Sequence, residues 1–159
     1  MNVEKATISD IAQIHRLVNH FAGRGEMLPR ALSELYENVR DFCVVRRGDE
    51  VVGCAALHVF WDNLAEIRSV AVSEDMREKG VGALVVEACI DEARALGIGE
   101  LFCLTYQRVF FERFGFYEVD KEKLPHKIWS ECLRCPKFPD YCDEIALVCP
   151  LKEDVELHG

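Results

Sequence analysis

Two closely spaced glycines follow basic side chains in the segment Arg77-Glu78-Lys79-Gly80-Val81-Gly82. A strand is predicted before this segment, and a long helix begins within it. Backbone N–H groups at a helix start lack partners inside the helix and attract anions, and glycine lets a ligand approach the backbone closely. The segment is therefore interpreted as an anion-binding loop, with an ordinary glycine-bearing helix start as the alternative. Its spacing differs from that of dinucleotide-binding and Walker loops.

The predicted strand before this loop carries two charged side chains. Glu66 and Arg68 are two residues apart, so they lie on the same face of a strand. A carboxylate there can take a proton from an attacking amine, which reacts only when it is neutral. The alternative is that the two side chains form an ion pair in solvent.

A thiol and an imidazole indicate a competing chemistry. Cys54 and His58 are four residues apart on another predicted strand and therefore share one face. Covalent catalysis by cysteine needs the thiol beside a base. Burial of both side chains in the core is the interpretation we favour, because they are more than one residue step apart.

Hydrophobic periodicity predicts the elements that position these residues, within one α/β domain covering residues 1–159. The order is strand, two helices, three strands, long helix, strand, short helix and two strands. This order predicts a mixed sheet that begins with antiparallel hairpins and contains one strand–helix–strand crossover. The predicted elements cover residues 3–6, 11–21, 33–39, 42–45, 51–60, 64–72, 80–96, 101–105, 109–114, 116–119 and 143–149.

Composition narrows the classes of function. The chain has 159 residues and a formal net charge of −9, which argues against nucleic acid or an anionic membrane as partner. Its N-terminus lacks the apolar segment of a secretory signal, and its longest nearly apolar stretch, Val51–Trp61, is too short to span a bilayer. We expect a cytoplasmic protein with a small-molecule substrate; a homodimer is left open.

Eight cysteines fall into two groups. Four stand singly in apolar runs and are expected to be buried thiols: Cys43, Cys54, Cys89 and Cys103. A Pro- and Cys-rich excursion, residues 126–142, holds a second group. Its alternatives are a structural zinc site, packed reduced thiols or a disulfide, and the zinc ligands would be Cys132, Cys135, Cys142 and His126.

The loop and its surroundings resemble the GNAT N-acetyltransferase superfamily. Arg77-x-x-Gly80-x-Gly82 matches that family's pyrophosphate loop, Val70-Ala71-Val72 stands at the family's distance before it, and Phe114-Gly115-Phe116 matches the usual ending of the last helix. The resemblance implies a mostly antiparallel, twisted sheet flanked by helices, with acetyl-CoA as co-substrate. The cofactor contacts it implies are Val70, Val72, Arg77, Glu78, Lys79, Gly80, Val81, Gly82 and Phe111.

A narrower resemblance, from about Ala6 to Pro125, is to the acetyltransferase domain of bacterial N-acetylglutamate synthase. It is carried by Leu28-Pro29-Arg30, Cys54-Ala55-Ala56-Leu57, Glu66, Leu101–Thr105 and Leu124-Pro125. This implies acetylation of the α-amine of glutamate in arginine biosynthesis, with Arg30 and Arg68 binding substrate. The alternatives are another small amine, a protein N-terminus, or a non-catalytic acetyl-CoA- or metal-binding module.

The same resemblance implies catalytic roles. Glu66 would act as general base and the backbone N–H of Val70 as donor to the thioester oxygen. Phe111 stands where many members of the family have a tyrosine acid, so Tyr106 or water would protonate the leaving thiolate. Arg108 is a further candidate for the substrate carboxylates. The basic residues that could replace the family's missing C-terminal contacts are Lys127, Arg134 and Lys137.

Overall fold

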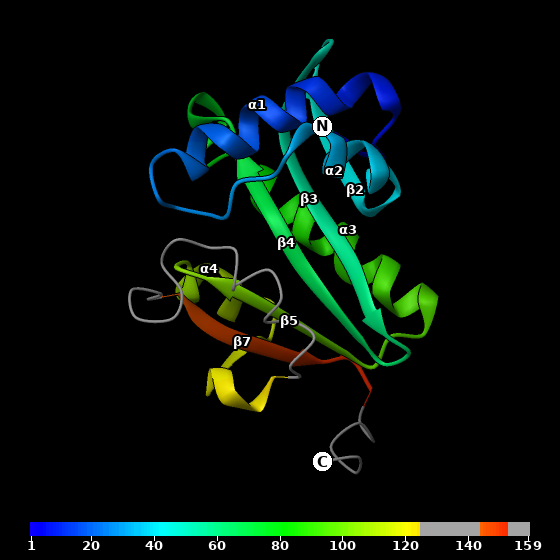
Figure 1. Cartoon of the computed structure of the whole chain (residues 1–159), viewed down its shortest axis with the longest axis vertical. Helices are drawn as coiled ribbons and strands as arrows, with labels where there is room; N and C mark the ends of the chain where they lie inside the picture. Colours follow the sequence, from blue (N-terminus) through cyan, green and yellow to red (C-terminus); the bar gives the residue numbers. More distant parts are fainter. Residues whose placement is uncertain (125–143, 153–159) are drawn as a thin grey trace. The chain divides into compact units, whose positions relative to one another are not determined.

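The computed structural model describes residues 1–124 and 144–152. The predicted order of elements is confirmed (Figure 1). The helices are α1 (Ile11–Ala22), α2 (Leu32–Glu37), α3 (Val81–Leu96) and α4 (Arg108–Glu112). The strands are β1 (Val3–Lys5), β2 (Phe42–Arg47), β3 (Glu50–Trp61), β4 (Leu64–Val72), β5 (Glu100–Thr105), β6 (Tyr117–Val119) and β7 (Ile145–Pro150). The periodicity did not predict the short 3₁₀ turns η1 (Ile8–Asp10), η2 (Val39–Asp41), η3 (Glu74–Met76) and η4 (Lys121–Lys123).

The strands form one mixed sheet in the order β1-β2-β3-β4-β5-β7-β6. Antiparallel pairing joins β1 to β2, β2 to β3, and β7 to both β5 and β6. Strands β4 and β5 are parallel and joined through α3, as the predicted crossover requires. The mostly antiparallel sheet flanked by helices is therefore confirmed.

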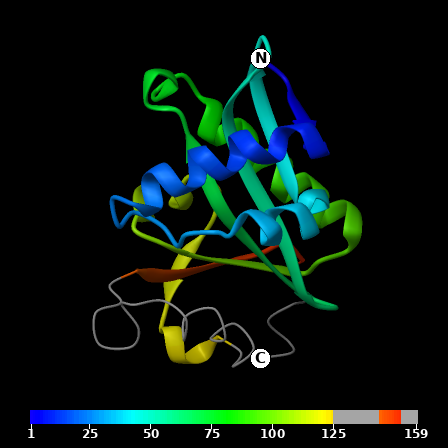
Figure 2. The same cartoon turned by 45° about the horizontal axis from the view of Figure 1, so that its top comes forward.

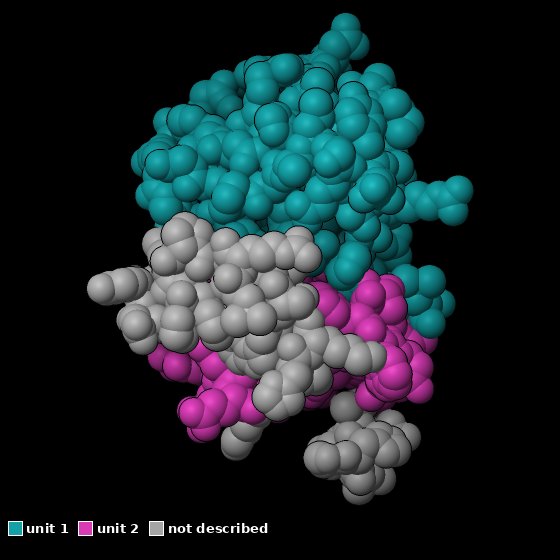
Figure 3. Space-filling model, in the orientation of Figure 1, with its two compact units in different colours: residues 1–58, 67–96 teal, residues 59–66, 97–159 magenta. Residues whose placement is uncertain are grey.

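The chain divides into two compact units (Figure 3). Unit 1 consists of residues 1–58 and 67–96, and unit 2 of residues 59–66 and 97–159. Strands β3 and β4 each contribute to both units, because the unit boundaries fall within these strands.

Unit 1 has helices on both faces of its strands (Figures 1 and 2). The apolar stripe of α1 (Ile11, Ile14, Val18 and Phe21) packs on a core that includes Leu35 of α2 and alternate residues of β2 and β3. The other face of β2 contacts α3, where the Sγ atom of Cys43 lies 3.6 Å from the carbonyl oxygen of Val85. Period-two alternation thus assigns neighbouring β2 residues to opposite layers.

The entry into α1 is fixed by a buried carboxylate. Asp10 accepts the backbone N–H of Thr7 at 2.8 Å, as in a capping box, and forms an ion pair with Arg46 at 2.6 Å. Burial opposes ionisation of Asp10, but the hydrogen bonds from Arg46 and Thr7 outweigh it and hold the pKa of this carboxyl below its ordinary value.

Unit 2 has its own core. Leu64 of β4, Phe102 of β5, Leu124, and Ala146 and Val148 of β7 are buried together. Residues 64–66 of β4 pair with residues 100–102 of β5, so this end of β4 is held in the ladder of unit 2.

The four cysteines predicted to be buried thiols are buried and free, and so is Cys149. Burial raises the pKa of Cys54 to about 12. The predicted zinc ligands Cys132, Cys135, Cys142 and His126 lie outside the described residues, so the zinc site stays a prediction. Within residues 1–124 and 144–152, no cluster of three acidic, histidine or cysteine side chains is arranged to hold a metal ion, and no helix could cross a membrane.

Candidate functional site

The predicted anion loop has an unusual backbone. Glu78 and Gly80 adopt positive φ angles of 66° and 82°, and α3 begins at Val81. Residues 77–80 are exposed, and a β-carbon at Gly80 would meet nothing within 4 Å. The space beside Gly80 is therefore open to a ligand, next to the N-terminus of a sixteen-residue helix whose first N–H groups attract anions.

A glycine in β3 supports the start of α3. A β-carbon at Gly53 would collide with Cγ1 of Val81, the first residue of the helix. Val81 is buried, so its side chain has little room to move away. The absence of a side chain at Gly53 thus allows the loop and helix start to lie directly on the strand.

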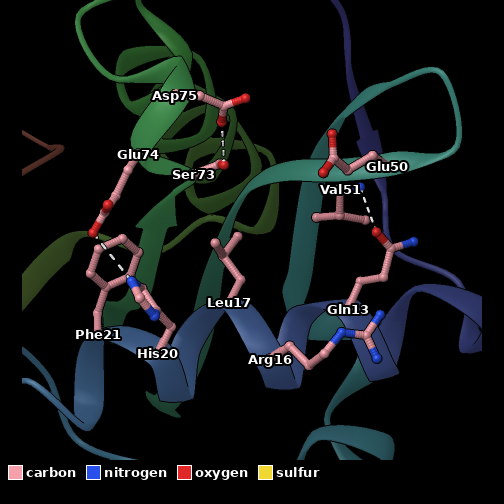
Figure 4. A pocket seen from close by; sticks show the side chains of 10 residues that line it. All are labelled: Gln13, Arg16, Leu17, His20, Phe21, Glu50, Val51, Ser73, Glu74 and Asp75. Carbon is pink, nitrogen blue, oxygen red and sulfur yellow. Dashed lines mark hydrogen bonds and ion pairs between the residues drawn. The ribbon is translucent and has the colours of Figure 1, made fainter.

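The last turn of α1 and the loop after it contact the segment before the anion loop (Figure 4). Glu74 lies 3.2 Å from Nε2 of His20 and also pairs with Arg24. The guanidinium of Arg77 lies over the ring of Phe21, 4.9 Å from its centroid. The hydrogen bonds from His20 and Arg24 lower the pKa of Glu74.

A pocket of about 440 Å³ lies between α1, the start of β3 and residues 73–75. Figure 4 shows that its side chains include both charged groups and the apolar Leu17, Phe21 and Val51. None of the residues predicted to bind substrate or cofactor lines it. The pocket therefore adjoins the segment that leads to the anion loop but is not the predicted site.

Strand β4 has an irregular backbone beside the predicted oxyanion donor. Ser69 is buried and has a φ of 56°, in the left-handed region that non-glycine residues rarely adopt. Its carbonyl accepts the thiol of Cys54 at 3.4 Å. A φ of this sign interrupts the regular strand conformation directly before Val70, and the role of the Val70 amide as donor stays a prediction.

Glu66 and Arg68 differ in exposure. Glu66 is only 5 % exposed, whereas Arg68 is half-buried. The burial of Glu66 rules out only the solvent-exposed form of the alternative ion pair, and its role as general base stays a prediction. A carboxyl this deeply buried needs partners that compensate for the loss of water, because burying an unpaired charge is costly.

The structure argues against covalent catalysis by Cys54. This residue is fully buried, and the rise of its pKa to about 12 keeps the nucleophilic thiolate form rare. His58 is bound through Nδ1 to Asp41 at 2.7 Å. The thiol of Cys54 donates to a backbone carbonyl, so burial in the core is confirmed for Cys54, whereas it is wrong for His58, which is half-buried and paired with Asp41.

Arg30 lies in the connection between α1 and α2 and is only 7 % exposed. Its Nη1 atom donates to Glu34 at 3.0 Å, and its backbone N–H and C=O both bond to the side chain of Asn19. Arg30 is therefore not a solvated surface arginine. Sequence reasoning did not single out Asn19 or Glu34, although asparagine inside a helix is a signal of local side-chain bonding.

The other predicted residues have varied surroundings. Phe111 is buried in unit 2, edge-on to Phe110 and Phe116, so its contact with the cofactor stays a prediction. Arg108 is exposed and pairs with Glu112 and Glu118. The predicted residues Lys127, Arg134 and Lys137 lie outside the described residues.

The candidate residues divide between the two units. Unit 1 contains the anion loop, Val70, Val72, Arg30 and Arg68, and unit 2 contains Glu66 and Phe111. Strand β4 carries Glu66, Arg68, Val70 and Val72 in one continuous segment that leads towards the loop.

The known proteins that this chain matches are acetyltransferases. Residues 10–116 match the model of the acetyltransferase (GNAT) family. An uncharacterized N-acetyltransferase of Chlorobaculum tepidum is 42 % identical over 146 residues, which cover 92 % of this chain and 94 % of the relative. An amino-acid acetyltransferase of Mycobacterium tuberculosis is 38 % identical over 135 residues, covering 83 % of this chain and 77 % of the relative.

A solved structure shares the fold. The N-acetylglutamate synthase of Neisseria gonorrhoeae, complexed with coenzyme A and N-acetyl-glutamate, matches with a TM-score of 0.85 and 26 % sequence identity. The match covers 95 % of this chain but only 35 % of the synthase. This chain thus corresponds to about a third of that enzyme.

Proposed function

Since the chain belongs to the acetyltransferase (GNAT) family, we propose that it transfers the acetyl group of acetyl-CoA to the α-amine of glutamate. Its homology with amino-acid acetyltransferases makes it an amino-acid N-acetyltransferase, and glutamate is the finer assignment. The observation that carries this assignment is the burial of Arg30, a cation kept out of solvent in a chain with a net charge of −9.

Glutamate carries two carboxylates that the protein must neutralise. A guanidinium binds a carboxylate through charge-assisted and often bidentate hydrogen bonds, which an ammonium cannot reproduce. We assign Arg30 to one substrate carboxylate and Arg68 to substrate binding as well. The similarity to a synthase complexed with N-acetyl-glutamate supports this choice of acceptor.

On the cofactor side, the pyrophosphate of acetyl-CoA would bind the amides of residues 78–82, beside Arg77 and Lys79. Val70, Val72 and Phe111 would contact the rest of the cofactor. The open space at Gly80 and the helix start at Val81 support this assignment. The match to a structure complexed with coenzyme A supports binding of acetyl-CoA by this fold.

The reaction begins with loss of a proton from the ammonium of the acceptor. Glu66 accepts this proton, directly or through water, and the neutral nitrogen attacks the thioester carbon. Negative charge then develops on the thioester oxygen, and the backbone N–H of Val70 donates to it. Loss of one such donor typically costs about 3–4 kcal/mol of transition-state stabilisation.

Collapse of the tetrahedral intermediate breaks the carbon–sulfur bond and releases the thiolate of coenzyme A, while the attacking nitrogen loses its second proton to water as the neutral amide forms. Water or Tyr106 supplies the proton that this sulfur takes up. Because a thiol has an ordinary pKa of about 8.5, the thiolate is a competent leaving group without a strong acid. We favour water, and we assign the reaction to arginine biosynthesis in the cytoplasm.

The test is a thiol-release assay with acetyl-CoA and each of the twenty amino acids, together with several polyamines. We expect turnover with glutamate to exceed that with every other acceptor. Turnover confined to polyamines would eliminate the glutamate assignment. Binding of acetyl-CoA without turnover of any acceptor would favour a binding module instead.

A further inference from the structure

The side chain of Asn19, in the second half of α1, bonds to two backbone segments. Its Nδ2 atom donates to the carbonyl of His15 at 2.9 Å and to the carbonyl of Arg30 at 3.0 Å. Its Oδ1 atom accepts the backbone N–H of Arg30 at 3.2 Å. One carboxamide thus holds both polar groups of the Arg30 backbone, eleven residues further along the chain.

Only a carboxamide of this length supplies what the Arg30 backbone needs. Arg30 belongs to no helix or strand, so its N–H and C=O have no ladder partners, and its burial makes unsatisfied groups costly. Asparagine offers one acceptor and two donors on a short side chain. Aspartate would keep the acceptor but lose both donors and repel two carbonyls, and alanine would lose all three bonds.

The guanidinium of Arg30 has a second anchor. Glu34, in the first turn of α2, accepts a hydrogen bond from its Nη1 atom at 3.0 Å. The residue is therefore held at both ends, by neutral hydrogen bonds at the backbone and by an ion pair at the tip.

We propose that Asn19 is a positioning residue for the acceptor carboxylate, acting through Arg30. The proposal rests on the proposed function, in which Arg30 binds that carboxylate. Asn19 fixes the backbone from which the guanidinium extends, so a bidentate bond forms without first ordering the connection between α1 and α2. Without Asn19, part of the free energy of substrate binding is used to order this connection. Binding of the amino acid therefore becomes weaker, and binding of acetyl-CoA is unchanged.

The chain offers a matched control in Asn38. Its Nδ2 atom donates to the carbonyl of Glu34 at 2.8 Å, the same four-residue back-bond that Asn19 makes to His15. Asn38→Ala therefore removes an equivalent bond near a helix end; this bond is to the backbone carbonyl of Glu34, so the carboxylate that holds Arg30 keeps its place.

Steady-state kinetics with glutamate and acetyl-CoA test the proposal in Asn19→Ala, Asn19→Ser, Asn38→Ala, Arg30→Ala and the Asn19→Ala/Arg30→Ala double variant. We expect Asn19→Ala to raise the KM for glutamate about tenfold, equivalent to about 1.4 kcal/mol, with the KM for acetyl-CoA within twofold. Asn38→Ala should leave both constants unchanged. In the Arg30→Ala background, removal of Asn19 should add little, because its effect passes through the missing guanidinium.

Three outcomes would overturn the proposal. An unchanged KM for glutamate in Asn19→Ala, with a raised one in Arg30→Ala, would reject the role of Asn19 and leave the proposed function standing. If Asn19→Ala and Asn38→Ala raised the KM for glutamate equally, Asn19 would act by stabilising its helix and not by positioning Arg30. An unaltered KM in Arg30→Ala would reject the substrate site itself. Asn19→Ser supplies the same readout if thermal melting shows that the alanine variant is unfolded.

Discussion

Helix α1 and the turn that follows it hold two segments of the proposed site by different means. The segment before the anion loop is held through charges: Glu74 pairs with His20 and Arg24, and all three side chains are about half exposed. The Arg30 backbone is held by a neutral carboxamide in a half-buried setting. Exposed ion pairs contribute little stability and are screened by salt. Part-buried hydrogen bonds between neutral groups are screened much less.

The difference matches what each ligand requires. A pyrophosphate offers several equivalent oxygens, so a loop that adjusts its backbone can still bind it. A carboxylate that must be recognised by a fork of N–H groups needs a fixed guanidinium. We therefore expect the cofactor side of the protein to tolerate small changes and the acceptor side to be sensitive to them.

Glu66→Gln gives the largest expected effect, and it sharpens the comparison because Glu66 belongs to neither region. Loss of a general base should lower kcat by about 100-fold or more near neutral pH while both KM values change little. The loss should shrink as pH rises and more amine deprotonates in solution. Glu100→Gln is the control, since Glu100 is a partly buried carboxyl on the adjoining strand. A loss of kcat that does not vary with pH would show that Glu66 only positions the substrate.

Arg30→Ala should give the next largest effect. Hydrogen bonds to charged groups contribute about 1.5–3 kcal/mol, so kcat/KM for glutamate should fall roughly 10- to 150-fold. Arg30→Lys keeps the charge but loses the fork, and its value should lie between those of the parent and the alanine variant. The exposed Arg40 provides a control in Arg40→Ala. If Arg30→Ala weakened acetyl-CoA and glutamate by the same factor, the acceptor site at Arg30 would not be separate from the cofactor loop.

Gly80→Val tests the cofactor loop. A branched side chain disfavours the positive φ of 82° and fills the space beside the helix start, so the KM for acetyl-CoA should rise about tenfold. Gly97→Val is matched to it, because Gly97 has a φ of 84° and equally open surroundings at the other end of α3. Equal KM values for acetyl-CoA in the two variants would remove the loop from the site.

Glu74→Gln should give the smallest effect, a two- to threefold rise in the KM for acetyl-CoA. Added salt should raise the KM of the parent towards that of the variant, since it screens the same ion pairs. Glu26→Gln removes another partner of Arg24 and leaves Glu74 in place, so it should behave like the parent. The comparison would be reversed if Glu74→Gln raised the KM for acetyl-CoA independently of salt, and by a larger factor than that by which Arg30→Ala lowers kcat/KM for glutamate.

Local sequence patterns predicted most of the fold. The apolar stripe of α1 and the short apolar runs of the strands set the order of elements, because periodicity records which face is buried. The bounds of α3 also agree, since Gly97 ends the apolar stripe. The η3 turn was not predicted, because its three residues form no periodic pattern.

The site was predictable only in part. The loop at Gly80 has a local signature, but the burial of Arg30 and Glu66 depends on residues distant in sequence. Asn19 contacts a residue eleven positions away, and no spacing rule predicts such a bond. The positive φ of Ser69 likewise depends on the tertiary structure, since serine has no preference for that conformation.

The reactivity of the buried thiols can be used to measure local opening of the chain. Cys54 is in unit 1 and Cys103 in unit 2, and burial raises the pKa of both thiols. An alkylating reagent attacks the thiolate, so each cysteine reacts only when its surroundings open. Peptide mass spectrometry after timed alkylation therefore measures the opening rate of each unit separately. Equal rates mean that the two units open together, and added acetyl-CoA slows whichever opening exposes its binding residues.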